Sequence, residues 1–496
     1  MRPQRIIIWV TAFFVVGIWV GLNFREAVYI ENGSTLDRFF RYLENEYVDT
    51  LDIPALEQDA MDYILSNLDP HSVLIPQENE TEISERMQGS FSGVGVEFTI
   101  YKDTLVFVHI MEGGPAEDYG LQAGDRIYAI DDDTIVGPDL TNALVTEKIK
   151  GPIDTYVVFK IKRDGLLLTA AVQRGLIPLE SVTGTRMFGP IGYTRIERFA
   201  ESTYEELEAA LGELSAQGMR SLVLDLRDNP GGYLHEAVDI ADLFLEEGKT
   251  IVSTKYKNGR TNIAEATSEG GYEDLPLHII LNGQSASASE VVSGALQDHD
   301  RATIYGSTSF GKGLVQEDKV LPDGSTVRLT VAYYYTPSGR SIQKPYDGAD
   351  LPGEMEGLVF TSDSGKVLAT SGGIEPDVPV VNDTTQAYYW GFSFGTIDDF
   401  AFEWIDGRRS IIQRWDKADF IQNHVISDEL LYEFLDYGGY GIILDDLSMN
   451  EIEELQLLLK SALAKNIWGF DAYRLVLQEQ DPILNEVVRQ ASGSLQ

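Results

Sequence analysis

The stretch HIILNGQSASASEVVSGAL, residues 278–296, joins an apolar run to a repeat of small residues and then to a second apolar run. A short apolar strand that leads through a turn into a helix is typical of α/β folds. Ser-x-x-Glu before an apolar run is the capping-box signature, so Ser287 could cap this helix with Glu290 at its N3 position. One of the three serine hydroxyls could equally be a nucleophile at the helix start. The stretch alone leaves both interpretations open.

Strands and helices alternate on both sides of this stretch, through residues 190–385. IGYTRIERF and SLVLDLRDNPGG have the pattern of strands, and TYEELEAALGELSAQG and HEAVDIADLFL have that of helices. Residues 90–175 predict a compact module of short strands with two short helices, since their apolar positions mostly alternate. From about residue 386 the chain is predicted to be mostly helical, with a 3.6-residue period in NEIEELQLLLKSALAKNIW.

The N-terminus has the pattern of a membrane anchor. Ile6–Phe24 carries no charge, follows two arginines, and is about as long as a helix needs to cross a bilayer. The arginines should stay in the cytoplasm, so the rest of the chain is predicted to face the periplasm or the cell exterior. A cleaved secretory signal, with a shorter apolar region and a small-residue cleavage site, is the alternative.

Composition excludes several classes of protein. Asp and Glu number 79 against 38 Lys and Arg, a net charge of -41, so nucleic acid is not an expected partner. The chain has no cysteine, which excludes disulfides, thiolate nucleophiles and cysteine-ligated zinc. No His-Glu-x-x-His or similar spacing occurs, so no metal and no cofactor are predicted.

The chain offers a lysine rather than a histidine as the base for a serine nucleophile. None of the 6 histidines has a neighbour that indicates catalysis. Lys312 lies in GSTSFGKG, where flanking glycines permit close packing, and a desolvated lysine loses its charge and becomes a base. The same octet is close to a phosphate-binding P-loop, but Gly313 lacks the hydroxyl that holds magnesium. The following LVQEDKVL alternates like a strand, whereas a P-loop leads into a helix.

The longer run NGQSASASEVVSGALQDHDRATIYGSTSFGKGLVQ, residues 282–316, resembles the core of the C-terminal processing peptidases, also called tail-specific proteases. The resemblance implies that Ser287 is the nucleophile of a serine endopeptidase. It also implies that Lys312 is the general base and that Gln316 orients the lysine. Other stretches that resemble this family are LDPHS, YYTPSGRSIQ and GGIEPDVPV. Asp298 matches an acid that the family often carries, and a structural role for it is at least as well supported as a catalytic one.

Two glycine-rich segments resemble further parts of the family. LDLRDNPGG, residues 224–232, is similar to the strand and turn that help to build the oxyanion hole. The implied backbone donors are Ala288 and one of the glycines Gly231 and Gly232. Residues 90–175 resemble a PDZ domain, in which SGVGV would receive the carboxylate of a bound peptide. The implied binding residues are Gly93, Val94, Gly95 and Val96.

Together these features predict an α/β multidomain protein: an α/β serine-protease core with an inserted PDZ-like β-rich module, an N-terminal membrane helix and a mostly helical C-terminal extension. The predicted parts are an anchor or signal segment (1–25), an N-terminal helical part (26–89), the PDZ domain (90–175), the protease core (176–385) and the extension (386–496). The expected partners are protein or peptide substrates that have free C-termini, and the membrane through the N-terminal helix. An adaptor protein or a second copy of the chain is a further candidate partner. Envelope or periplasmic proteins are the expected substrates. A catalytically inactive PDZ scaffold and a P-loop nucleotide-binding protein are the alternatives.

Overall fold

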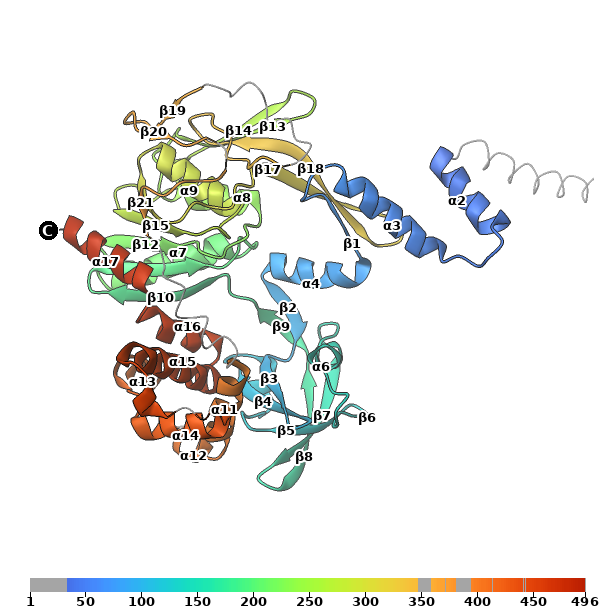
Figure 1. Ribbon diagram of the computed structural model, residues 1–496, viewed down its shortest axis with the longest axis vertical. Helices are drawn as coiled ribbons and strands as arrows, with labels where there is room; N and C mark the ends of the chain where they lie inside the picture. The colour runs from blue at the N-terminus through green and yellow to red at the C-terminus, as the bar shows by residue number, and fades with distance from the viewer. Residues whose placement is uncertain are drawn as a thin grey trace, which may run out of the picture. The chain divides into compact units, whose positions relative to one another are not determined.

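The computed structural model describes residues 34–346, 358–370, 372–380, 394–412, 414–439, 441 and 443–495 (Figure 1). The chain divides into two compact units. One comprises Met1–Ile75 with Asp318–Leu329, and the other comprises Pro76–Glu317 with Thr330–Gln496.

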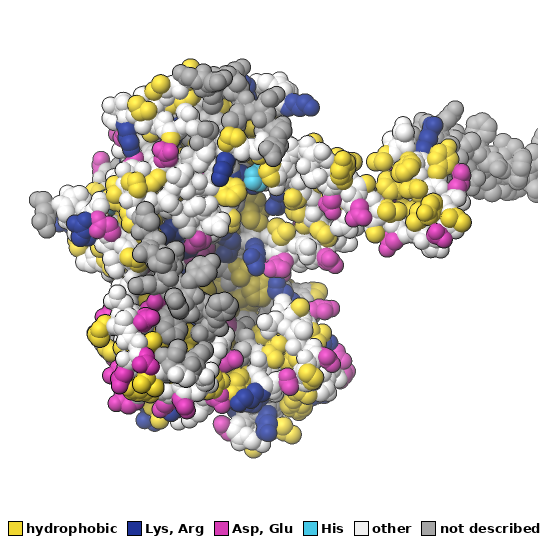
Figure 2. Space-filling view, viewed as in Figure 1, with side chains coloured by type: hydrophobic (Ala, Val, Ile, Leu, Met, Phe, Trp, Pro, Cys, Tyr) yellow, Lys and Arg dark blue, Asp and Glu magenta, His cyan; other side chains and the backbone are white. Residues whose placement is uncertain are grey.

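The smaller unit contains helices α2 (Thr35–Glu46) and α3 (Ile53–Ser66) and the short strand β1 (Val73–Ile75). β1 pairs antiparallel with the start of β18 (Thr326–Tyr335). Ser34 begins α2 in a capping box. The helix has no buried residue, and Figure 2 shows hydrophobic side chains gathered over it.

The predicted membrane anchor, Ile6–Phe24, lies outside the described residues. Within the described ranges, no helix combines the length and the apolar character needed to span a bilayer.

A mostly parallel sheet forms the centre of the larger unit. Its order is β10-β11-β12-β15-β16-β21, in which β10 pairs antiparallel with β11 and the other pairs are parallel. The strands are β10 (Val182–Phe188), β11 (Ile191–Ile196), β12 (Ser221–Asp225), β15 (Leu277–Leu281), β16 (Ala302–Gly306) and β21 (Val378–Pro379). Three helices follow successive strands: α7 (Thr203–Ala216), α8 (Leu234–Asp242) and α9 (Ala288–Asp298). Their buried side chains form one hydrophobic cluster with the strands.

A smaller antiparallel sheet joins this core through β13 (Thr250–Tyr256). β13 pairs with β14 (Thr261–Glu265) on one side and with the end of β18 on the other. β17 (Leu314–Val320) begins two residues after Lys312 and pairs with β18. Because a strand and not a helix follows Lys312, the P-loop alternative is wrong.

The β-rich module predicted for residues 90–175 is present, and its last strand, β9, continues to Pro178. Its sheet has the order β3-β4-β5-β7-β8, with β6 paired to β5, so β3 is an edge strand. These strands are β3 (Val96–Tyr101), β4 (Thr104–Ile110), β5 (Arg126–Ile130), β6 (Asp133–Thr134), β7 (Tyr156–Arg163) and β8 (Leu166–Gln173). Two short helices, α5 (Pro115–Asp118) and α6 (Asn142–Ile149), complete the module. β2 (Ser90–Gly93) pairs with β9 (Gly175–Pro178) where the chain enters and leaves it, after α4 (Gln77–Gln88).

The C-terminal region is helical, as predicted, and most of it has its own hydrophobic cluster. Its helices are α11 (Phe394–Asp406), α12 (Arg409–Ile412), α13 (Lys417–Asn423), α14 (Asp428–Gly438), α15 (Met449–Trp468), α16 (Phe470–Gln478) and α17 (Pro482–Ser494). α17 is different, because its buried side chains pack with strands of the central sheet instead. The mixed α/β class with a helical C-terminal region is confirmed, whereas the domain boundaries stay predictions.

Candidate active site

The turn between β15 and α9 gives Ser287 an unusual backbone. Ser287 is the N-cap of α9, with φ of 54° and ψ of -111°. A positive φ is uncommon for any residue with a side chain, and such strain is kept where the surrounding structure enforces it. The predicted capping box with Glu290 is present, and the Ser287 N–H donates to Glu290 Oε2 over 2.9 Å.

The three serines of SASASE differ in exposure. Ser285 is fully buried, and its hydroxyl donates to the carbonyl of Leu226 over 2.8 Å. Ser289 is also fully buried, and its hydroxyl donates to the carbonyl of Asn229 over 3.1 Å. Ser287 is partly exposed. Of the three hydroxyls, that of Ser287 is therefore the one that a substrate can reach.

One buried carboxylate joins the Ser287 turn to the Lys312 loop. Glu290 is fully buried, and its Oε2 accepts the N–H groups of Ser287 and Lys312, each over 2.9 Å. Its Oε1 accepts the Ser309 hydroxyl over 2.6 Å and the Gly311 N–H over 2.7 Å. Burial raises the pKa of Glu290, although these four hydrogen bonds favour the ionised form. Glu290 thus fixes the backbone of both residues at once.

Tyr334 links the same two segments from β18. Its hydroxyl donates to the Lys312 carbonyl over 2.7 Å and lies 3.2 Å from the Ser287 carbonyl oxygen. Burial, together with the nearby Glu290 charge, raises the pKa of Tyr334 well above its ordinary value, so the hydroxyl stays a donor.

The Lys312 side chain contacts Gln316, the residue predicted to orient it. Lys312 Nζ donates to Gln316 Oε1 over 2.6 Å, and both side chains are partly buried. Because Gln316 lies on β17, the strand fixes the position of the amide oxygen. The Gln316 amide oxygen is therefore a neutral acceptor that can orient the amine.

The glycine turn after β12 lies against the nucleophile. A Cβ atom on Gly231 would come within 2.8 Å of the Ser287 Cβ. The Gly231 N–H already donates to Asn229 Oδ1 over 2.8 Å. Within the described ranges, neither the Gly232 N–H nor the Ala288 N–H has a protein acceptor. Of the two predicted turn glycines, Gly232 is the one whose amide remains available.

Comparison with known proteins identifies the family. The model of peptidase family S41 matches residues 190–350, and the PDZ domain model matches residues 92–173. A carboxy-terminal-processing protease of Bartonella bacilliformis is 35% identical over 347 residues, which cover 67% of this chain and 79% of that protein. The chain belongs to the carboxy-terminal-processing protease family.

Other proteins are also similar to this chain. The carboxy-terminal processing protease CtpA of Bacillus subtilis is 32% identical over 64% of this chain and 69% of its own length. A solved photosystem II D1 C-terminal processing protease is 29% identical and covers 70% of this chain and 87% of its own, with a TM-score of 0.38. Residues 392–469 match a family of unknown function, DUF8443. On the two family models and the Bartonella relative, the protein is a peptidase with a PDZ domain, as predicted.

The predicted carboxylate loop of the PDZ domain lies between β2 and β3. The carbonyls of Val94 and Gly95 accept the N–H groups of Ala116 and Met111 over 2.8 and 3.0 Å. For the N–H groups of Val94 and Gly95, the structure places no acceptor among the residues it describes. Gly93 ends β2 and Val96 begins the edge strand β3. Two unused amides next to an edge strand suit a peptide that binds as an added strand.

Asp298 has a structural role at the other end of α9. It is buried, and its Oδ1 accepts Arg340 over 2.8 Å while its Oδ2 accepts the Ser338 N–H over 3.0 Å. Ser287 begins the helix and Asp298 ends it. Asp298 therefore holds the loop after β18 in place and does not reach the nucleophile.

One group of side chains in the described part of the protease has ligand atoms close enough for a metal ion. His235 Nε2 lies 3.4 Å from Glu201 Oε2 and 3.6 Å from Glu236 Oε1. These distances equally suit ion pairs of a protonated histidine, and Glu236 also accepts the Tyr204 N–H over 2.8 Å. That catalysis needs no metal and no cofactor stays a prediction.

The sequence did not indicate that Glu290, Asn229 and Tyr334 would support the site. Glu290 was visible as a capping residue, but the loop that it also holds is about twenty residues away. The fold brings these three side chains next to the Ser287 and Lys312 segments. No local sequence pattern indicates those contacts.

Proposed function

We propose that this protease is a serine endopeptidase in which Ser287 is the nucleophile and Lys312 is the general base. The observation that carries this proposal is the Glu290 carboxylate, which holds the N–H groups of Ser287 and Lys312 on one oxygen. Such a shared anchor keeps the two residues in a constant relation, as a catalytic pair requires. Gln316 would orient the lysine amine through the hydrogen bond described above.

The reaction would be acyl transfer. Neutral Lys312 accepts the proton of the Ser287 hydroxyl while the serine oxygen attacks a peptide carbonyl. The N–H groups of Ala288 and Gly232 donate to the oxyanion that forms, and the N-terminus of α9 adds a favourable dipole. Lys312 then returns the proton to the leaving amine, and water hydrolyses the acyl-enzyme.

Substrates would be selected by their C-termini. A free carboxylate would accept the N–H groups at Val94 and Gly95, and the peptide would extend along β3 as an added strand. If Ile6–Phe24 is an uncleaved anchor, the protease would act on envelope or periplasmic proteins. An adaptor or a second copy of the chain would be a further partner.

A serine-reactive probe tests the proposal most directly. A fluorophosphonate should label the wild-type protein and should not label Ser287→Ala. Ser293→Ala is the matched control, because Ser293 lies buried on the same helix and should be dispensable. Lys312→Ala should abolish cleavage of an unstructured peptide, and the double variant should be scarcely worse than either single one. Substantial cleavage by folded Lys312→Ala would contradict the dyad.

A further inference from the structure

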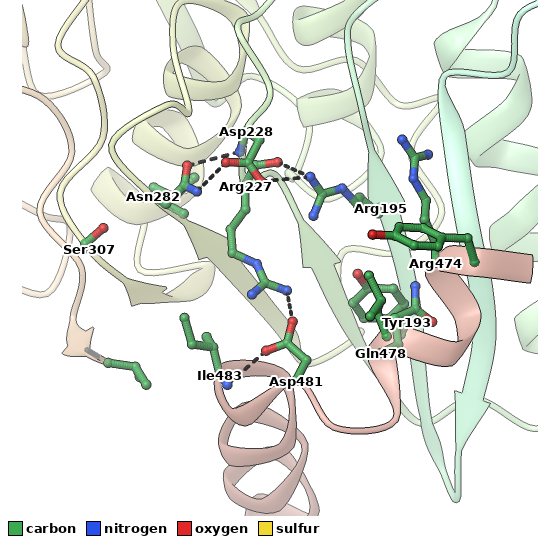
Figure 3. Close-up of a pocket in the computed structure, with 14 residues that line it drawn as sticks. Tyr193, Arg195, Arg227, Asp228, Asn282, Ser307, Arg474, Gln478, Asp481 and Ile483 are labelled. Carbon is green, nitrogen blue, oxygen red and sulfur yellow. Dashed lines mark hydrogen bonds and ion pairs between the residues drawn. The ribbon is translucent and has the colours of Figure 1, made fainter. Parts of the chain in front are cut away.

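The C-terminal extension meets the protease core at a charged cavity (Figure 3). The cavity of ≈ 650 Å³ is lined by residues at the carboxyl ends of β11, β12 and β15 and by residues of α16 and α17. Figure 3 shows Arg227 extending from the loop after β12 toward Asp481 at the start of α17. Their side chains form an ion pair, with Arg227 Nη2 2.6 Å from Asp481 Oδ2.

The arginines that line this cavity are matched by carboxylates. Arg195 pairs with Asp228 over 3.1 Å, and Arg474 pairs with Glu197 over 2.8 Å. Arg227 pairs with Asp225 as well as with Asp481. The cavity is therefore charge-balanced, which suits a joint between two parts of the chain better than a site for an anionic ligand.

Asp481 divides its two oxygens between the extension and the core. Oδ1 accepts the N–H groups of Ile483 and Leu484, each over 2.9 Å, and so caps α17. Oδ2 accepts Arg227. A charged hydrogen bond of this kind is roughly twice as strong as a neutral one. The position of the α17 N-terminus is thus tied to that of Arg227.

The loop that begins with Arg227 continues to the glycine turn at the active site. Two residues beyond Arg227, the Asn229 carbonyl accepts the N–H of Ala286 over 2.9 Å and the hydroxyl of Ser289 over 3.1 Å. The Asn229 side chain holds the Gly231 N–H. Arg227 itself is fixed on its other side by the fully buried Asp225 at the end of β12. One short loop therefore connects the extension to the segment that faces Ser287.

We propose that Asp481 is a positioning residue for the protease, because by holding Arg227 it fixes the loop that presents the Gly232 N–H to the reacting carbonyl. This inference rests on the proposed function of Ser287 and the turn. An oxyanion donor stabilises the transition state only if it is already in place, so small displacements of the loop lower the rate. The extension would then support catalysis directly, and undocking of α17 would weaken it.

Two substitutions at Asp481 and one matched control test the role. Asp481→Asn and Asp481→Ser both keep a good N-cap for α17 but remove the charged acceptor of Arg227. Glu479→Gln is the control, because Glu479 pairs with Arg186 on β10 over 2.7 Å and joins the same two parts without touching the loop. Each variant is made in the full chain, and kcat and KM are measured on an unstructured peptide at 25 °C, together with thermal unfolding.

We expect both Asp481 variants to lower kcat roughly tenfold or more, with KM within about twofold of wild type. Glu479→Gln should keep kcat within about twofold of wild type, even if its melting temperature falls as far as those of the Asp481 variants. Equal kcat values for Asp481→Asn, Asp481→Ser and Glu479→Gln would overturn the positioning role. The Ser287→Ala variant separates the two proposals. If it is inactive while the Asp481 variants match wild type, this inference alone fails. If it remains active, the proposed function fails and this inference falls with it.

Discussion

Replacing Glu290 by glutamine should show whether one carboxylate holds the active site together. Glu290 is fully buried, with two hydrogen bonds to each oxygen. Glutamine has nearly the same shape, but its NH2 group donates and cannot accept. The substitution therefore removes acceptors without opening a cavity.

The cost follows from the two orientations of the amide. With its NH2 group toward Ser309, it can donate to that hydroxyl, but the buried Gly311 N–H loses its acceptor. In the other orientation the N–H groups of both Ser287 and Lys312 lose theirs. An unsatisfied buried donor costs about 1–3 kcal/mol, and the remaining hydrogen bonds lose the assistance of the charge. We expect the free energy of unfolding to fall by about 3–5 kcal/mol.

A second glutamate provides a matched control. Glu206 Oε2 accepts the N–H groups of Ser181 and Val182 over 2.6 and 2.8 Å, and Oε1 accepts the Ser202 hydroxyl over 2.6 Å. Glu206→Gln should therefore also destabilise the protein, but it does not touch the Ser287 turn. The melting temperatures of both variants are measured first. Folded samples of each variant are then labelled at Ser287 with a fluorophosphonate, at a temperature below both transitions. Glu290→Gln should label at least tenfold more slowly, and equal labelling rates would refute the role of Glu290 as the shared anchor.

Three further predictions concern stability, the glycine turn and substrate selection. Burial lowers the pKa of His278 to about 4, so the unfolded chain binds a proton below about pH 6.5 that the folded chain does not. Between pH 7 and pH 4 the free energy of unfolding of wild type should therefore fall by about 3 kcal/mol more than that of His278→Leu. Urea unfolding of both proteins at the two pH values measures this, and an equal loss in both proteins would contradict the prediction. Gly231→Ala should abolish fluorophosphonate labelling, because its Cβ would lie 2.8 Å from that of Ser287, whereas Gly218→Ala has a similar positive φ and open space and should label normally. A peptide with a C-terminal amide should be cleaved much more slowly than the free acid, and Gly95→Leu should remove that difference; equal cleavage of both peptides by wild type would exclude carboxylate recognition.

The local elements were predictable because their signals are local. Asp164-Gly165 is a dipeptide that favours a two-residue hairpin turn, and both residues have positive φ, 48° and 80°, between the paired Arg163 and Leu166. Such a turn matches the twist of its two strands. The alternating LVQEDKVL likewise became β17, which decided against the P-loop. By contrast, the hairpin of β13 and β14 was not identified, although Asn258-Gly259 marks its turn.

The site was predictable only in part. Family resemblance supplied Ser287, Lys312 and Gln316, but the sequence could not distinguish Gly231 from Gly232. That distinction depends on the Asn229 side chain, which accepts the Gly231 N–H. The backbone geometry of the turn decides which N–H group the side-chain oxygen accepts. The order of the residues alone does not determine that geometry.

The role of α17 was beyond sequence reasoning for a different physical reason. Parallel sheets are buried on both faces, and α7, α8 and α9 pack in a single cluster with the sheet. In a second cluster, Ile483, Leu484 and Val487 of α17 pack with strand residues that include Tyr193, Val223 and Ile280. Each such side chain stabilises the fold by about 1.5–3 kcal/mol when fully buried.

The helical period of the extension predicts its helices but not the partner of the last one, because the rest of the extension has a core of its own. The boundary predicted at residue 385 therefore marks a change from alternating strands and helices to helices alone. The side chains of α17 nevertheless pack against strands that precede this boundary. Loss of α17 would expose one face of the central sheet and release Arg227 at the same time. The stability of the core and the geometry of the loop before Gly232 thus depend on the same helix, so in this protease a test of the extension is also a test of the active site.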